Sequence, residues 1–162
     1  MEPGPPFPVP DRLPLLGNCA QHLFWLCPEA QTTWTFFLQG FASLVKHPIT
    51  WDQIVFGSNM APAPEAPSEA HEDIKTLFHI TRSVVLRMLW LHRNELVFGH
   101  IQEPNFQRVK ILSANYIKTH ILSHFGKLWF QGQFSDLFDH IFSLTAAPSP
   151  REDSSTQRNV SS

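Results

Sequence analysis

The feature that most restricts the fold is an unbroken helical pattern over residues 71–98, a stretch that contains neither proline nor glycine. A helix of this length spans a domain, and its apolar face needs other elements to cover it. Arg82, Arg87 and Arg93 lie mostly off that face, and Gly99 ends the pattern. The side chains of the apolar face recur at three- and four-residue spacing: Ile74, Leu77, Phe78, Thr81, Val84, Val85, Met88, Leu89, His92 and Leu96.

Four further stretches have helical patterns, at residues 29–45, 51–56, 105–125 and 135–142. Pro28 suits the first turn of the first one, where a missing N–H costs nothing. Thr50 and Gln53 form a capping box for the second, and Asn105 is a cap for the third. No stretch alternates as a strand does. The sequence predicts an all-α fold, an irregular bundle of about five helices whose two long helices form an antiparallel pair.

Three stretches are predicted to be unstructured in a chain whose 162 residues suggest one domain. The arm over residues 1–18 is rich in proline, which favours extended backbone. The tail over residues 145–162 has too few large apolar residues to offset the entropy of ordering. Residues 58–70, rich in Pro, Ala and Glu, form a linker between a cysteine-bearing part, 19–57, and a helical region, 71–144.

The sequence also predicts where the protein resides. Two cysteines, Cys19 and Cys27, do not make a disulfide framework and fit a reducing compartment or a metal site. The N-terminus lacks the basic and apolar regions of a signal peptide. No run approaches the length of a transmembrane helix. We therefore expect an intracellular protein, cytoplasmic or nuclear, without a membrane partner.

A basic block covers residues 74–127, which hold eight Lys/Arg and two acids, while the whole chain has a net charge of −2. Such a block suits contact with the phosphates of RNA or DNA. The simpler interpretation is a pair of solvated helix faces, and it is the favoured one. The candidate nucleic-acid-binding residues are Arg82, Arg87, Arg93, Arg108, Lys110 and Lys118.

Aromatic side chains accompany this block. Trp90 and Phe98 could stack on bases, with Arg93 contacting phosphate. Their position in a helical pattern instead favours packing in the core. The packing role is therefore the stronger prediction.

Motifs of enzymes are absent from the sequence. There is no phosphate-binding glycine loop, dinucleotide fingerprint, nucleophile elbow or H-E-x-x-H. Two acidic pairs, Glu72 with Asp73 and Asp136 with Asp139, lie in the first turns of helices, where carboxylates stabilise the helix dipole. No catalytic residue and no small-molecule substrate are predicted.

Cys19, His22 and Cys27 are candidate zinc ligands, because thiolate and imidazole are the ligands that structural zinc prefers. A fourth ligand is missing nearby, and His47 or His71 could help only if the fold brought them close. The alternative is that His22 makes a hydrogen bond and Cys27 is a small buried hydrophobe. The alternative is favoured, since three ligands fall short of a structural site.

Two motifs in order resemble a known family. The first is His22-Leu23-Phe24-x2-Cys27-Pro28 followed by Trp34, and the second is Trp90-x2-Arg93-Asn94-x2-Val97-Phe98. Together they are similar to the C-terminal zinc-binding region of non-LTR (LINE-type) retrotransposon reverse transcriptases, over roughly residues 19–99. The resemblance implies an accessory role, binding template RNA or target DNA beside the polymerase.

This sequence departs from the family pattern in two ways. The family's cysteine pair upstream of His22 is missing, so only His22 and Cys27 carry over as ligands. The polymerase palm and fingers are also missing, so the resemblance implies a truncated, non-catalytic fragment.

The first hypothesis for function is therefore a retrotransposon-derived helical fragment with weak RNA or DNA binding. The alternatives are a helical protein-interaction module with an exposed Phe/Trp surface, or an expressed relic without a selected function.

Overall fold

The computed structural model describes residues 19–57, 60–126, 132 and 134–145. Within these residues every regular element is helical, apart from one isolated β-bridge between Val45 and Pro62. The all-α prediction is confirmed. The predicted arm over residues 1–18 lies outside the described residues, as does the tail beyond Thr145.

Six α-helices follow one another in the described residues, with short turns of other helix types between them. All five predicted helices are present, and their bounds agree closely except at the end of α2. The elements are α1 (Cys19–Gln21), the π-helical turn η1 (His22–Leu26), α2 (Pro28–Phe41), α3 (Trp51–Phe56), the 3₁₀ turn η2 (Ser68–Ala70), α4 (His71–Val97), α5 (Phe106–Phe125), α6 (Ser135–Phe142) and the 3₁₀ turn η4 (Ser143–Thr145).

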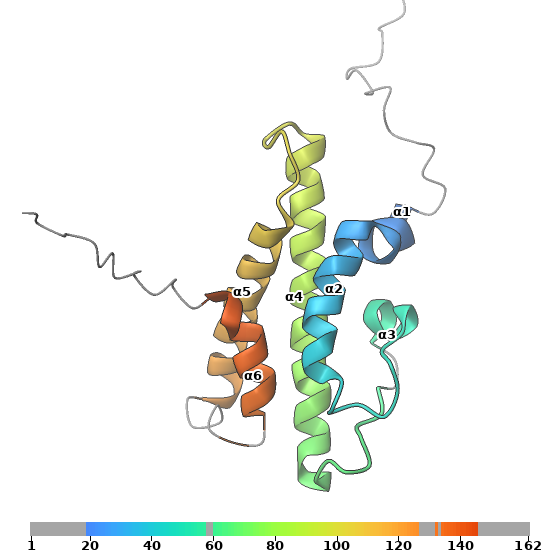
Figure 1. The fold of residues 1–162 in the computed structure, drawn as a ribbon, viewed down its shortest axis with the longest axis vertical. Coiled ribbons are helices and arrows are strands. Elements are labelled where there is room, and N and C mark those ends of the chain that lie inside the picture. Colours follow the sequence, from blue (N-terminus) through green and yellow to red (C-terminus); the bar gives the residue numbers. More distant parts are fainter. Residues whose placement is uncertain (1–18, 58–59, 127–131, 133, 146–162) are drawn as a thin grey trace, which may run out of the picture.

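Helix α4 is the spine of the bundle. Its 27 residues extend for about 40 Å, and Figure 1 shows α5 running antiparallel beside it. Its C-terminal end projects beyond α5 in the same view. The predicted apolar face is confirmed, with Leu96 half-buried and the rest buried: Ile74, Leu77, Phe78, Thr81, Val84, Val85, Met88, Leu89 and His92.

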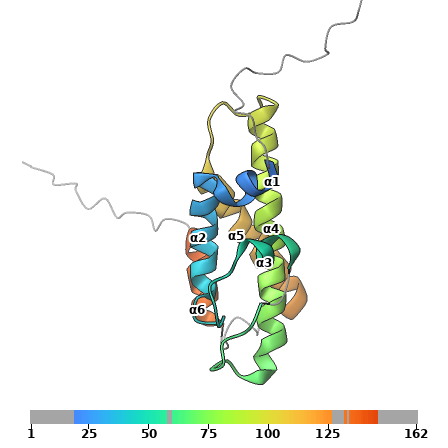
Figure 2. The same ribbon diagram turned by 90° about the vertical axis from the view of Figure 1, so that its right-hand side faces the viewer.

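Helices α2 and α6 cover the other side of the core. In the turned view of Figure 2, they line one side of the molecule and α4 lines the opposite side. Gly40 permits the close packing of α2 on α6, because a Cβ there would lie 2.6 Å from Leu137 Cδ1. The His140 ring stacks on Phe36, and its Nε2 lies 2.7 Å from the Phe36 carbonyl oxygen. These contacts fix α6 across α2.

The segment predicted as an unstructured linker, 58–70, is packed over its described part, and that prediction is wrong for residues 60–70. Met60, Ala63 and Ala70 are buried, because small apolar side chains fit against the core despite the disorder-prone composition. The same segment shortens α2. The helix ends at Phe41, and the chain after it pairs with the linker segment, where Lys46 N–H donates to the Ala61 carbonyl at 2.9 Å.

Helix α3 is joined to the bundle by its own buried Ile54 and by one polar side chain of α4. The predicted capping box of Thr50 and Gln53 is present, and Gly57 ends the helix with a left-handed φ of 66°. Arg82 of α4 donates from Nη1 to the carbonyl of Ile54 at 2.7 Å. A Cβ at Gly57 would lie 2.8 Å from the Arg82 guanidinium, so glycine serves both the turn and this contact.

His92 holds the start of α5 against α4. Its Nε2 accepts a hydrogen bond from the Asn105 N–H at 3.1 Å, and its ring meets the edge of Phe106. Asn105 is the predicted cap of α5, since its side chain accepts from Arg108 N–H at 2.8 Å. The Nδ1 atom of His92 is buried without a hydrogen-bond partner in the described residues, 3.9 Å from Glu95.

We predict that the stability of the bundle falls as the pH drops below about 6.5, the ordinary pKa of histidine. Burial lowers the pKa of His92, and it outweighs the opposite effect of Glu95. The folded state therefore favours neutral His92, and its contribution is present above the unfolded pKa and lost on acidification. The free energy of urea unfolding, measured at about pH 5 and about pH 7.5, checks this.

His92→Gln should flatten this pH dependence, because the amide oxygen can accept from Asn105 N–H without titrating. Part of the dependence should remain, since burial and Arg82 also lower the pKa of His79. The control is His120→Gln, at an exposed position of α5. An unchanged slope in His92→Gln would contradict the proposed role of the buried ring.

Candidate functional site

The His22–Trp34 motif forms a helical corner. Residues from Cys19 to Leu26 make one helical segment, closed by a hydrogen bond from Cys27 N–H to the His22 carbonyl at 2.8 Å. Cys27 is extended, and Pro28 starts α2. The buried Trp34 donates from Nε1 to the Phe24 carbonyl at 2.6 Å. The motif thus has a structural purpose, which is to lock η1 onto α2.

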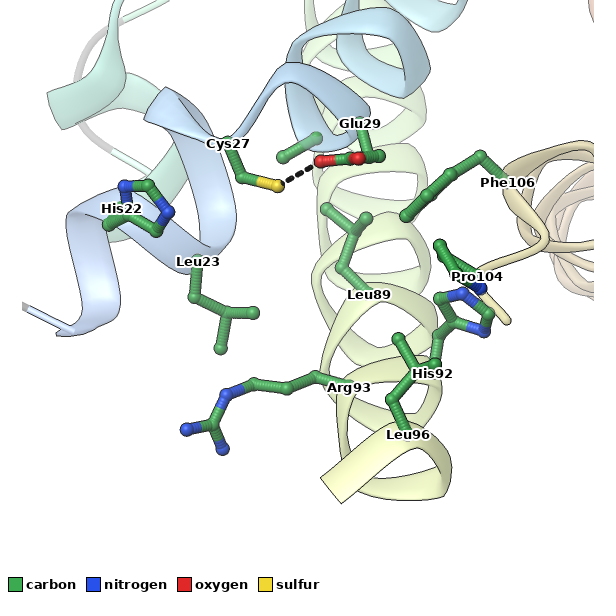
Figure 3. A pocket seen from close by; sticks show the side chains of 11 residues that line it. His22, Leu23, Cys27, Glu29, Leu89, His92, Arg93, Leu96, Pro104 and Phe106 are labelled. Atoms are coloured by element: carbon green, nitrogen blue, oxygen red, sulfur yellow. Dashed lines mark hydrogen bonds between the residues drawn. The ribbon is translucent and has the colours of Figure 1, made fainter. Parts of the chain in front are cut away.

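The described part of the corner does not gather metal ligands. The Cys27 thiol donates to Glu29 Oε2 at 2.5 Å, and Figure 3 shows its sulfur pointing away from His22. Among the side chains that the structure describes, no three His, Cys, Asp or Glu are close enough to hold a metal ion. Cys19 begins α1, but its side chain lies outside the described part. The expectation from the sequence, which favours the alternative over zinc, remains a prediction.

The two histidines considered as a fourth ligand lie elsewhere. His47 follows the C-terminal end of α2, whereas Cys27 precedes its N-terminal end. His71 opens α4, at the end of the bundle opposite to the corner (Figure 1). Its Nε2 lies 3.1 Å from the Ala66 carbonyl oxygen. The fold therefore separates both residues from His22 and Cys27.

Four of the six candidate nucleic-acid-binding residues have contacts within the bundle. Arg82 binds carbonyls of α3, and Arg108 makes two hydrogen bonds with Glu95 at 2.6 and 3.3 Å. Lys110 and Lys118 lie over phenylalanine rings, at 6.0 and 5.4 Å from their centroids. A cation that already has a partner has less to gain from phosphate.

The other two candidates, Arg87 and Arg93, make no hydrogen bond or ion pair within the described residues. Both belong to the C-terminal half of α4, where Arg87 is exposed and Arg93 is half-buried. Trp90 lies between them in the sequence, one helical turn from each. The structure therefore leaves two free cations beside one aromatic ring.

The outward side of this half of α4 is called the α4 outer face. It consists of Arg87, Trp90, the half-buried Asn94, Val97 and, just after the helix, Phe98, and Arg93 borders it. Trp90 is 49% exposed and Phe98 is 70% exposed, so the prediction that both pack in the core is wrong. The reason is angular, because Trp90 is one residue past buried Leu89 and therefore about 100° away from it around the helix.

A pocket lies on the other side of Arg93, and it is called the corner pocket. Its volume is about 220 Å³, and Figure 3 shows η1 on one side and α4 on the other. Apolar side chains dominate its walls, and Arg93 reaches across the lower part of the view. The lining residues are His22, Leu23, Cys27, Glu29, Ala30, Leu89, His92, Arg93, Leu96, Pro104 and Phe106.

Sequence reasoning missed the corner pocket, because it forms between segments that are far apart in the chain. One feature of the sequence could have indicated the pocket. When the residues of α4 are placed around the helix, Arg93 lies between the buried stripe and Trp90, at the edge of the packed side. The lining side chains come from the corner, α4 and the start of α5.

Comparison of this chain with protein-family models, with curated proteins and with solved structures finds no match to any of them. The resemblance to the reverse transcriptase region thus rests on the quoted motifs alone. None of the described helices is long and apolar enough to cross a membrane.

We predict that Cys27 reacts slowly with alkylating reagents and that Glu29→Gln makes it faster. Burial is the main cause of the raised pKa of the Cys27 thiol, and the hydrogen bond to Glu29 raises it further. Removing the carboxylate charge should increase the thiolate fraction and the rate a few-fold. The measurement is iodoacetamide modification at about pH 8, followed by mass spectrometry in a Cys19→Ser background. An equal or lower rate in Glu29→Gln would contradict the contact.

Proposed function

We propose that this chain is a non-catalytic helical fragment related to the zinc-binding region of LINE-type reverse transcriptases, and that it binds single-stranded RNA or DNA weakly through the α4 outer face. The observation that carries the proposal is the exposure of Trp90 between two arginines that have no partner among the described residues. The second family-like motif supports it, since Trp90, Val97 and Phe98 are among its residues and all three are exposed.

The chemistry of this face suits a single strand. An exposed indole offers a stacking surface to any base, and such stacking needs no particular sequence. Arg87 and Arg93 are each three residues from Trp90, so their Cα atoms are separated by about 9 Å along the helix axis. One base on Trp90 and the flanking phosphates on the arginines would use all three side chains. RNA and DNA share these groups, so the face serves both.

The small number of cations without a partner in the described residues supports weak binding. Two free arginines contact few phosphates, whereas the sequence suggested six cations. For a single strand that neutralises two phosphates, the slope of log K against log salt is about −1.4. Binding should therefore be weak and depend on salt only moderately.

We predict that Trp90→Ala weakens binding of a labelled oligonucleotide of about ten bases. Loss of one stacking contact costs about 1–3 kcal/mol. Arg87→Gln should reduce the salt slope to about −0.7. Fluorescence anisotropy over about 20 to 200 mM salt measures both effects.

The matched control is Phe56→Ala, which removes an aromatic side chain that is 73% exposed on α3. Its affinity should equal that of the parent chain. Absence of binding at low salt, or equal losses in the Trp90 and Phe56 variants, would overturn the proposal.

A second candidate function is protein interaction, and a specific observation favours it. Trp90, Val97 and Phe98 are three large apolar side chains that are exposed along the C-terminal part of α4 and just after it. Contiguous exposed apolar surface commonly marks a protein contact. A second copy of this chain could cover the same surface, since two projecting helix ends can pair symmetrically.

We predict that, under this second function, the chain self-associates and Phe98→Ser abolishes the association. Sedimentation velocity over a range of concentrations measures it. Phe56→Ser is the control, because it removes an exposed phenylalanine from another helix. A monomer at all concentrations would eliminate this candidate without affecting the oligonucleotide experiment.

A further inference from the structure

We propose that the corner pocket binds one unstacked base of the strand whose neighbouring base lies on Trp90, with Arg93 contacting the phosphate between them. The proposal rests on the proposed function and adds a site to it. It also assigns a preference, since the pocket should take a base that carries an amino group.

The size of the pocket fits a base. An apolar cavity of about 150 Å³ holds a benzene ring, and the corner pocket has about 220 Å³. A pyrimidine with its ring substituents is only a little larger than benzene. Two leucines, Leu23 of η1 and Leu89 of α4, face the space from opposite sides in Figure 3. They provide two apolar surfaces between which a planar ring can lie.

The walls of the pocket are held in place. Trp34 ties the η1 wall to α2 through the Phe24 carbonyl, at 2.6 Å. His92 ties the opposite wall to the start of α5 through Asn105, at 3.1 Å. A preformed pocket does not lose affinity through ordering of its own side chains.

Glu29 supplies the polar recognition. Its Oε2 accepts from Cys27, and its other carboxylate oxygen makes no hydrogen bond within the described residues. That oxygen can accept from an exocyclic amino group, which cytosine has and uracil lacks. Uracil has a carbonyl oxygen at the same position, which would face the carboxylate oxygen without a proton between them and would be repelled. The geometry therefore favours cytosine over uracil.

Arg93 connects the pocket to the α4 outer face. It lines the pocket and has no partner in the described chain, and it follows Trp90 by one helical turn. A strand that stacks one base on Trp90 would pass its phosphate over Arg93 before the next base reaches the pocket. A base that is already single-stranded enters such a pocket at little cost.

The experiment compares three oligonucleotides of about ten residues: all uridine, the same with one central cytidine, and the same with one central abasic site. We expect the cytidine oligonucleotide to bind roughly fivefold more tightly than the uridine one, because it gains a hydrogen bond to a carboxylate. The abasic oligonucleotide should be the weakest. Equal affinities for all three would overturn the pocket and leave the stacking function standing.

Two variants test the pocket itself. Leu23→Trp, at a half-buried wall position, should fill the space and make the three oligonucleotides equal while leaving the Trp90 contact. Glu29→Gln should reduce the preference for cytidine, because its amide can also donate to uracil. Circular dichroism confirms that each variant is folded. Persistence of the preference in both variants would overturn the assignment.

A second arm does not depend on the α4 outer face. Cytidine 5′-monophosphate is titrated into the chain with labelled leucine methyl groups, and the NMR signals of Leu23 and Leu89 are followed. We expect both signals to shift in the parent chain and in Trp90→Ala, whereas the Leu89 signal should not shift in Leu23→Trp. No shift at Leu89 in the parent chain would overturn the pocket, whatever the oligonucleotides do. Shifts without any oligonucleotide binding would support the pocket and remove the stacking function.

Discussion

The structure depends on one buried stripe along α4. Much of the described chain is positioned by that stripe or by residues at its border, whereas α6 docks on α2 and α5. Helices α5 and α2 pack on it directly. Two polar side chains of α4 connect it to further elements by hydrogen bonds: Arg82 to the end of α3, and His92 to the start of α5. A long helix with a single apolar face can organise a small domain, because the elements that cover it are also brought together.

The same constraint explains the location of the candidate site. Packing occupies one side of α4, and the bundle partners do not extend to its C-terminal end. Trp90 is therefore exposed on the uncovered side of α4, and Phe98 is exposed just beyond the C-terminal end of the helix. Arg93 lies at the border between the packed and the open side, where it lines the corner pocket and stays unpaired in the described chain. The candidate site thus lies where the packing ends.

The sequence predicts the features that depend on neighbouring residues, such as helix bounds and caps. The bounds of α4 follow from a stretch without Pro or Gly, and the caps at Thr50 and Asn105 follow from residue types near helix starts. Long-range partners are different. The pairing of Arg108 with Glu95, the burial of Met60 and the corner pocket depend on how distant segments meet. The exposure of Trp90 could be predicted only in part. Its angle on the helix follows from the sequence, whereas the positions of the helices that cover α4 do not.

The hydrogen bond between His140 and Phe36 joins residues that are 104 positions apart, and this has a consequence for the order of folding. Helices α4 and α5 are joined by a short loop, so their pairing is local and can form early. Docking of α6 on α2 closes a loop of about a hundred residues, which carries a larger entropic cost. The face of α2 that α6 covers is therefore expected to stay open until the pairing of α4 with α5 has formed.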